Sequence, residues 1–332
     1  GMGMATIFGC FFFAGTSGSS SADTITIGRI MIPAMTKRGY DRSYAASLAA
    51  AGGILGVIVP PSLIFIIYGI ATSTSIGDLF LGGILPGLLL AFVMCVSNYF
   101  VCTTSKWGNV ERKNFSGRYL ATAIWGAKYG LGAPFIILGG IYSGIFTPTE
   151  AASVAVGYVA FVEVFINRSI GYQDIAAALR RAAIMTGVLG PIIAFSILFG
   201  ETLAILRVPT NLVEFFLSLP VDFVGSVFLI VIVLLLLGCI LEPIAAILVV
   251  MPILLPIGME LGFDPVHFGV FVVTTLSVGF ITPPVGINLF AAAVVSEEPF
   301  LKIAFKAIPA FLSLIVAIGI IVTFPSMVLW FR

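Results

Sequence analysis

The sequence is poor in charge. Only 9% of its 332 residues are charged and 60% are hydrophobic, whereas soluble domains carry roughly 25% charged residues. A water-soluble fold would lack the polar residues needed to cover its exterior, which excludes that class of protein. Several apolar stretches reach or approach the ~20 residues that a helix needs to cross the hydrocarbon core. They are residues 43–70, 79–104, 183–206, 223–241 and 303–325. We therefore expect an all-α integral membrane protein.

Histidine and cysteine are also scarce. The chain has one histidine and four cysteines, and its net charge of +1 gives no reason to expect nucleic-acid binding. The cysteines lie in apolar runs without the spacing of metal ligands, so we predict small buried apolar side chains rather than disulfides. They are Cys10, Cys95, Cys102 and Cys239.

The basic residues are grouped. Most of the 16 lysines and arginines fall in four loops, and the loops between them contain almost none. This alternation is typical of the positive-inside rule, which assigns the four basic loops to the cytoplasm. The groups are Lys37, Arg38 and Arg42; Lys106, Arg112, Lys113, Arg118 and Lys128; Arg168, Arg180 and Arg181; and Lys302 with Lys306.

The chain contains an internal repeat. Without gaps, segments 223 positions apart share turn glycines, prolines and an aspartate that apolar composition alone does not explain. Upstream of these, Gly9-Cys10 matches Gly238-Cys239 at an offset of 229, which predicts six extra residues in the first copy. The ungapped matches are Pro33 with Pro256, Gly39 with Gly262, Asp41 with Asp264, Gly56 with Gly279, Ile58 with Ile281, Pro60-Pro61 with Pro283-Pro284, Ser73 with Ser296 and Pro86 with Pro309.

The two copies are predicted to be inverted. Five crossings, an odd number, are expected between them, over 43–70, 79–104, 130–146, 150–167 and 183–206. The loop at 37–42 is basic, whereas its counterpart at 259–265 has no basic residue. Inverted repeats are typical of carriers that work by alternating access around a site near the bilayer midplane. We expect a first repeat over 1–104, connecting scaffold helices over 105–222 and a second repeat over 223–332.

Each copy begins with two apolar pieces that are each too short to span. They cover 3–14 and 22–35 in the first copy, and 225–240 and 244–258 in the second. Such lengths favour a re-entrant hairpin. The predicted tips are Gly15–Ser21 and Leu241-Glu242-Pro243. At membrane depth, irregular backbone of this kind survives only when buried in protein or lining a cavity.

Each hairpin is followed by a helix that a diproline interrupts. Proline cannot donate a hydrogen bond and frees carbonyls about one turn earlier. These carbonyls, together with Ser62, Thr282 and Asn288, would supply hard oxygen ligands for Na⁺. The interrupted segments are VIVPPSLIF at 57–65 and FITPPVGIN at 280–288.

Several long motifs resemble one known family. GTSGSSSADTITIGRIMIPAMTKRGYD, GVIVPPSLIF, GIFTPTEAASVAVGY and GFITPPVGINLF are similar to the large membrane subunit of the tripartite ATP-independent periplasmic (TRAP) transporters. The resemblance implies an elevator-type carrier of the bacterial inner membrane, driven by Na⁺ and containing two hairpins and two discontinuous helices. It also implies a small membrane subunit, separate or fused, and a periplasmic binding protein that delivers an organic acid.

The family's ion sites lie at the hairpin tips and broken helices. This places the expected Na⁺ ligands at Ser17, Gly18, Ser19, Ser20, Pro60, Ser62, Thr282, Pro283, Gly286 and Asn288. The repeat also implies counterparts of residues 130–228 before Gly9, so we expect the chain to be the C-terminal portion of a longer polypeptide.

A few polar residues in the apolar body are candidates for substrate binding or coupling. Glu242 lies at the second hairpin tip and Arg207 in an outward loop, where it could bind a carboxylate or anchor a helix end. Glu150 follows a helix-start pattern and could be a cap or functional, and Ser73 is one of the repeat matches. Asp23 and Arg29 lie six residues apart, off the i,i+4 spacing of a helical ion pair.

Two other functions are weighed against the carrier. Gly15-Thr16-Ser17-Gly18 reads as the G-x-S-G of intramembrane serine proteases, but the only base available is His267, which we expect at the opposite surface. A channel would also accommodate inverted repeats. The substrate is barely specified: family members carry sialic acids, C4-dicarboxylates and other carboxylates, and sialic acid is our first expectation.

Overall fold

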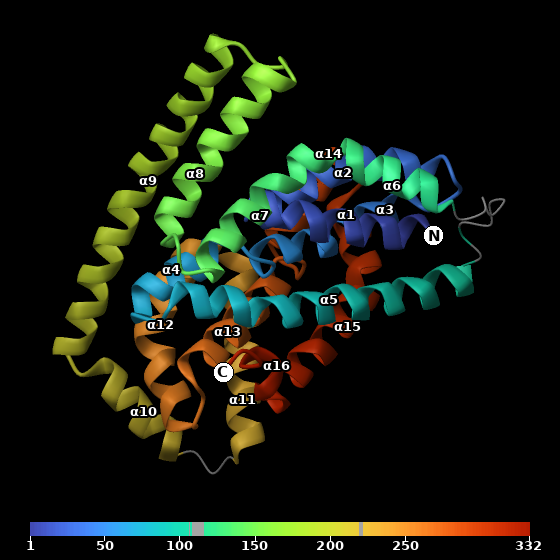
Figure 1. The fold of residues 1–332 in the computed structure, drawn as a ribbon. Helices are drawn as coiled ribbons and strands as arrows, with labels where there is room; N and C mark the ends of the chain where they lie inside the picture. Colours follow the sequence, from blue (N-terminus) through green and yellow to red (C-terminus); the bar gives the residue numbers. More distant parts are fainter. Residues whose placement is uncertain (106, 108–115, 219–221) are drawn as a thin grey trace. The chain divides into compact units, whose positions relative to one another are not determined.

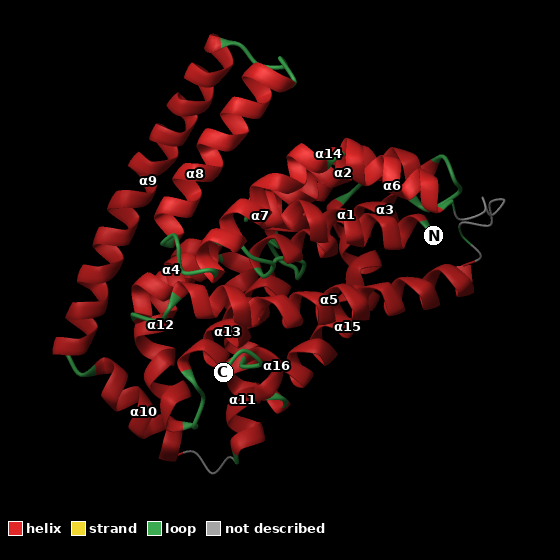
Figure 2. Ribbon diagram, in the orientation of Figure 1, coloured by secondary structure: helices red, strands yellow, loops and turns green. Residues whose placement is uncertain are grey.

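The computed structural model describes residues 1–105, 107, 116–218 and 222–332, and within these ranges it contains helices and no strand (Figure 1, Figure 2). Lys106, Arg112 and Lys113 of the second basic group lie outside them. In chain order the helices are α1 (Met2–Ser17), α2 (Ser20–Thr36), α3 (Arg42–Gly53), the 3-10 helix η1 (Ile54–Val57), α4 (Leu63–Thr72), α5 (Ile76–Ser105), α6 (Gly117–Gly126), α7 (Lys128–Tyr142), α8 (Pro148–Phe161), the π-helix η2 (Val162–Ile166), α9 (Tyr172–Ile205), α10 (Val208–Ser218), α11 (Phe223–Ile240), α12 (Pro243–Glu260), α13 (Pro265–Gly279), α14 (Ile287–Ser296), α15 (Phe300–Thr323) and α16 (Pro325–Val328).

Six helices in the described part of the chain are long and apolar enough to cross a membrane. They are α5, α8 continued by η2, α9, α11, α12 and α15. The prediction of an all-α membrane protein is confirmed. Two details differ from expectation. Helix α7, expected as a crossing at 130–146, has 15 residues, and α11 and α12 have 18 residues each. Because α11 and α12 are each long enough to span, their length does not show that the second hairpin is re-entrant. The inversion of the copies stays a prediction.

The chain forms two compact units. One contains residues 1–110 and 197–332, and the other contains residues 111–196. In the smaller unit α7 packs on α8. The hydroxyl of Tyr158 donates to the carbonyl of Tyr129 over 3.1 Å, and Gly132 leaves room for its ring because an added Cβ would lie 2.2 Å from the tyrosine oxygen.

The larger unit contains both predicted hairpins, α1 with α2 and α11 with α12. The helix ends at the first tip, Ser17 and Ser20, lie 223 positions before those at the second tip, Ile240 and Pro243. The ungapped repeat therefore extends through both tips. The six extra residues predicted for the first copy are absent, and Gly15 rather than Gly9 is the counterpart of Gly238.

Both predicted broken helices are present. The first consists of α3, η1 and α4, and the second of α13 and α14, with Pro60-Pro61 and Pro283-Pro284 in the breaks and both diproline bonds cis. Beyond each break the copies shift by one residue, because Val285 adds a position before α14 begins. The structural counterpart of Ser73 is accordingly Glu297, since both end their helix with a positive φ, of 55° and 57°.

The shared G-x-D motif builds the same turn in both copies. Gly39 and Gly262 have φ of 80° and 85°, a region that other residues enter at a cost. Two residues later, Asp41 accepts a hydrogen bond from the backbone of Tyr44 at the start of α3. Asp264 accepts from the backbone of Val266 and caps α13 in the same way.

The two copies pack against each other in a reciprocal way. Helix α14 packs on α2, and α4 packs on α12, so each broken helix lies against the other copy's hairpin. Hydrogen bonds and ion pairs also join residues of the two copies near the ends of their helices. Ser43 at the start of α3 donates to Glu298 over 2.7 Å, and Lys302 pairs with the same carboxylate at 3.0 Å. Arg332, the last residue, forms ion pairs with two carboxylates, that of Asp78 in the first turn of α5 at 2.9 Å and that of Asp264 before α13 at 2.5 Å.

Replacing Gly262 should isolate the cost of the turn. An added Cβ meets nothing within 4 Å there, so Gly262→Ala should lower stability through the backbone alone, by about 1–2 kcal/mol. Thermal unfolding in detergent measures this, and Gly262→Asn should lose less because asparagine tolerates the left-handed region. Unchanged stability of Gly262→Ala would contradict the turn described here.

The link at Glu298 should make stability depend on pH. Hydrogen bonds from Ser43 and Lys302 hold the pKa of this carboxyl below its ordinary value of 4.5. A pKa that is lower in the folded state adds stability above the unfolded pKa, and this stability is lost as pH falls through the folded pKa. We expect Glu298→Gln to lower the melting temperature at neutral pH, with the difference shrinking as the pH falls below 4.5. A difference that stays constant with pH would show that the link does not stabilise the fold.

Candidate functional site

The first hairpin tip lies against the first diproline. Gly18 between α1 and α2 has φ of 59°, and a Cβ placed on it would lie 3.3 Å from the carbonyl oxygen of Pro61. Ser19 follows in extended conformation at the N-cap of α2. Its backbone N–H donates to the hydroxyl of Ser17 over 3.2 Å. A residue with a side chain at position 18 would push the tip away from the break.

Asp23 is buried directly behind this tip. The hydroxyl of Ser17 donates to its Oδ1. Its Oδ2 has no hydrogen-bond partner among the described residues, although a buried carboxylate oxygen is costly to leave unpaired. Gly56 at the first break lies against it, and a Cβ there would sit 2.5 Å from Oδ2 and 2.8 Å from the carbonyl oxygen of Ser19. Two acceptor oxygens therefore converge beside the break.

Asp23 is not among the site residues predicted from the sequence, where it is compared only with Arg29 as a possible local ion pair. The signal that could have selected it was present, because an ionisable side chain within a membrane hairpin is a functional candidate by default.

Asn288 connects three segments that are far apart in sequence. Ser20 donates to its Oδ1 over 2.5 Å, and its Nδ2 donates to the carbonyl of Ala50 over 3.0 Å. It is fully buried at the start of α14. The second broken helix is thereby attached both to the first hairpin and to the first broken helix.

The second hairpin is held to the second broken helix by backbone contacts. The N–H of Gly286 donates to the carbonyl of Cys239 over 3.1 Å. Gly238 and Gly279 lie so close that a Cβ on Gly279 would be 2.7 Å from the carbonyl carbon of Gly238. A Cβ on Gly238 would be 2.2 Å from the carbonyl oxygen of Leu276. Helices α11 and α13 are therefore in direct backbone contact at these glycines.

Both hairpin tips face one small cavity of about 70 Å³. Its lining contains the first residues of four helices, namely α2 at Ser20, α4 at Leu63, α12 at Pro243 and α14 at Ile287. Helix N-termini carry partial positive charge and unpaired N–H groups. No lysine or arginine is among the lining residues, so the positive character comes from the backbone. The lining also contains the carboxylate of Glu242, which caps α12, so the uncapped N-terminus of α2 is the part suited to a further anionic group.

The four N-termini differ in how they are capped. Ser62 accepts from the N–H of Phe65 at the start of α4, and Glu242 accepts from the N–H groups of Ile244 and Ala245 over 2.9 and 3.2 Å. Ser19 and Gly286 make no side-chain cap on α2 and α14. Two ends therefore have side-chain caps and two do not, and at α14 the backbone N–H of Asn288 donates to the carbonyl of Phe280 over 3.1 Å.

The other predicted Na⁺ ligands lie at or near the two breaks. The hydroxyl of Ser62 donates to the carbonyl of Val57 over 2.5 Å, and that of Thr282 to the carbonyl of Val278 over 3.1 Å. Pro60 is buried in the first break and Pro283 lies in the second. Their assignment as ligands stays a prediction.

Three of the predicted substrate residues are absent from this cavity. Arg207 is exposed in the turn between α9 and α10, and Ser73 is exposed at the end of α4. Glu150 lies in the smaller unit, where its carboxylate and Thr147 complete a capping box at the start of α8. Glu242 does line the cavity, beside Ser19, Ser20 and Gly18.

The serine–histidine pair of a protease is not formed. His267 is buried in α13, with its Nε2 2.8 Å from the carbonyl oxygen of Ile321. The hydroxyl of Ser17 is instead bonded to Asp23. Among the residues that the structure describes, no group of three or more His, Cys, Asp or Glu side chains could hold a metal ion, so a cation here would need hydroxyl and carbonyl oxygens as well.

The glycine contact between α11 and α13 generates a prediction. Gly238→Ala or Gly279→Ala inserts a methyl group into backbone, which cannot rotate away, and each should cost about 1–3 kcal/mol or prevent folding. Gly319→Ala on α15 is the matched control, because its added Cβ meets nothing within 4 Å and alanine favours helix. Expression and melting temperature in detergent are the readouts. Equal stability of all three variants would exclude this close contact.

Comparison with known proteins identifies the family. Residues 1–327 match the family described as the DctM component of the tripartite ATP-independent periplasmic transporter. The isethionate TRAP transporter permease of Oleidesulfovibrio alaskensis is 38% identical over 100% of this chain, which spans 52% of that relative. The large C4-dicarboxylate permease of Pseudomonas aeruginosa is also 38% identical, over 98% of this chain and 76% of the relative. The large sialic acid permease of Vibrio cholerae is 34% identical, over 99% and 76%.

The chain thus spans about half the length of the first of these relatives and about three quarters of the other two. The match to the family covers the hairpins, both diproline breaks and the connecting helices. The chain belongs to the large permease components of the TRAP transporters, a family of multi-pass membrane transport proteins.

Proposed function

We propose that this chain forms the carrier of a Na⁺-coupled importer for an organic acid in the bacterial inner membrane. A periplasmic binding protein delivers the acid, a small membrane subunit completes the complex, and an elevator movement gives alternating access. The observation that carries the proposal is the meeting of four helix N-termini at one cavity between the hairpin tips. Helix N-termini directed at anionic groups near the midplane are typical of carriers built from repeats.

The residues beside the first break are suited to Na⁺. Asp23 supplies a buried carboxylate oxygen without a partner among the described residues, and the carbonyl oxygen of Ser19 approaches the same face of Gly56. Freed carbonyls of an unwound membrane helix commonly coordinate Na⁺. A bound cation would offset the cost of the buried charge. Asp23 thus joins Ser17 and the other predicted ligands.

The cavity is suited to the acidic group of the substrate rather than to a whole molecule. Pockets for drug-sized ligands are ~300–1,000 Å³, whereas this one is about 70 Å³. The uncapped N-terminus of α2 would donate its N–H groups to a carboxylate there. Relatives are named for sialic acid, C4-dicarboxylates, isethionate and ectoine, and sialic acid is the first substrate to test.

Reconstitution in proteoliposomes tests the proposal. Uptake of the labelled acid should require a Na⁺ gradient and the cognate binding protein. Asp23→Asn should raise the Na⁺ concentration for half-maximal uptake at least about tenfold, as loss of a metal-site partner commonly does. Asn288→Ala should raise it as well, because the ties to Ser20 and Ala50 are lost.

Asp78→Asn is the matched control, since Asp78 pairs with Arg332 away from the cavity. Uptake that is unchanged without Na⁺ would contradict the ion assignment. Single-channel currents without the binding protein would favour a channel.

A further inference from the structure

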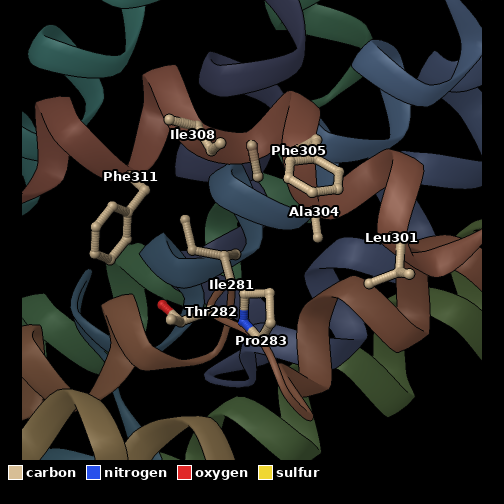
Figure 3. Close-up of a pocket in the computed structure, with 9 residues that line it drawn as sticks. Ile281, Thr282, Pro283, Leu301, Ala304, Phe305, Ile308 and Phe311 are labelled. Carbon is tan, nitrogen blue, oxygen red and sulfur yellow. The ribbon is translucent and has the colours of Figure 1, made fainter.

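A second cavity lies on the other side of the second diproline break. It has a volume of about 240 Å³. Figure 3 shows Ile281, Thr282 and Pro283 of the break facing Phe305, Ile308 and other side chains of α15. The space exists because α15 presents two small residues toward the break, Ala304 and Ala307. It is larger than the about 150 Å³ apolar cavity that binds benzene in an engineered protein.

The lining offers almost nothing to a polar ligand. All but one of its side chains are apolar. The exception, Thr282, already donates its hydroxyl proton to the carbonyl of Val278, and Pro283 has no N–H. A buried water needs two to four polar partners. The occupant must therefore be apolar.

The mouth of this cavity is formed by exposed apolar side chains of a membrane helix. Helix α15 has 24 residues and a mean hydropathy of 2.4 over its most apolar stretch. Leu301 and Phe305, which line the cavity, are 63% and 70% exposed. The cavity therefore opens onto the exposed apolar surface of α15.

The basic end of the helix indicates how an occupant would be oriented. Lys302 directly follows Leu301, and its side chain is 52% exposed although it pairs with Glu298. Lysines at a helix end mark the level of the lipid headgroups, whose phosphates they attract. A phospholipid with its headgroup near Lys302 would have an acyl chain beside Leu301 and Phe305.

We propose that this cavity is a binding site for one acyl chain of a membrane phospholipid. The chain fills the space between α15 and the second break and packs against Pro283. Its removal leaves the apolar lining without contacts. Its lining shares no residue with the cavity between the hairpin tips, although Thr282 and Pro283 are also predicted Na⁺ ligands.

Fluorescence quenching by phospholipids brominated on the acyl chain tests the site. The complete transporter is reconstituted with Phe305→Trp at the mouth or, as the matched position, Leu312→Trp on the same helix outside the cavity. The fluorescence of the unchanged protein is subtracted. We expect half-maximal quenching of the Phe305→Trp protein at a severalfold lower mole fraction of brominated lipid, because a bound chain exchanges into a preferred site.

Filling the cavity should abolish that preference. Ala304→Phe added to Phe305→Trp should bring the two quenching curves together, whereas Leu312→Phe should leave the preference intact. Ala307→Val provides a smaller filling variant if the first does not fold.

Three outcomes would overturn the proposal. The first is equal quenching of the Phe305→Trp and Leu312→Trp proteins when no filling substitution is present. The second is a tryptophan at position 305 that lipid does not quench because protein covers it, and the third is preferential quenching of this tryptophan by a brominated detergent only.

Discussion

In hydrocarbon every backbone N–H and C=O must find a partner, and a helix that breaks must find its partners elsewhere in the protein. This constraint governs the larger unit. Each diproline frees backbone groups, and each hairpin tip exposes more. The chain pairs them across segments, as when Gly286 bonds the carbonyl of Cys239 and Asn288 bonds that of Ala50. Hairpins and broken helices therefore support one another and cannot be understood singly.

The second broken helix contributes residues to both cavities. Thr282 and Pro283 border the apolar cavity against α15, and Ile287 borders the polar cavity between the hairpin tips. Few residues intervene.

Much of this architecture could be predicted from the sequence, because proline and glycine act locally. A diproline breaks a helix wherever it stands, and the repeated Gly39-x-Asp41 and Gly262-x-Asp264 motifs build the same turn and cap. The pattern of apolar runs located the hairpins for a similar reason. The one-residue shift at Val285 was not predictable, since the ungapped sequence match continues past it.

The site was less accessible from sequence than the fold. The exposed positions of Arg207 and Ser73 depend on turns whose direction the sequence does not show. The oxygen of Asp23 that has no partner among the described residues packs against Gly56, 33 positions later. A rule based on the spacing of residues close in sequence does not predict that contact. The convergence of four helix N-termini is likewise a property of packing between copies.

Ser19 and Glu242 occupy equivalent places in the two copies, each as the residue before its hairpin's second helix. Glu242 folds its own carboxylate onto the N-terminus of α12, whereas Ser19 leaves the N-terminus of α2 without a side-chain cap. The two copies therefore differ in charge at this position. Under the proposed function, the first copy receives the acidic group of the substrate at this position, where the second copy holds a carboxylate of its own.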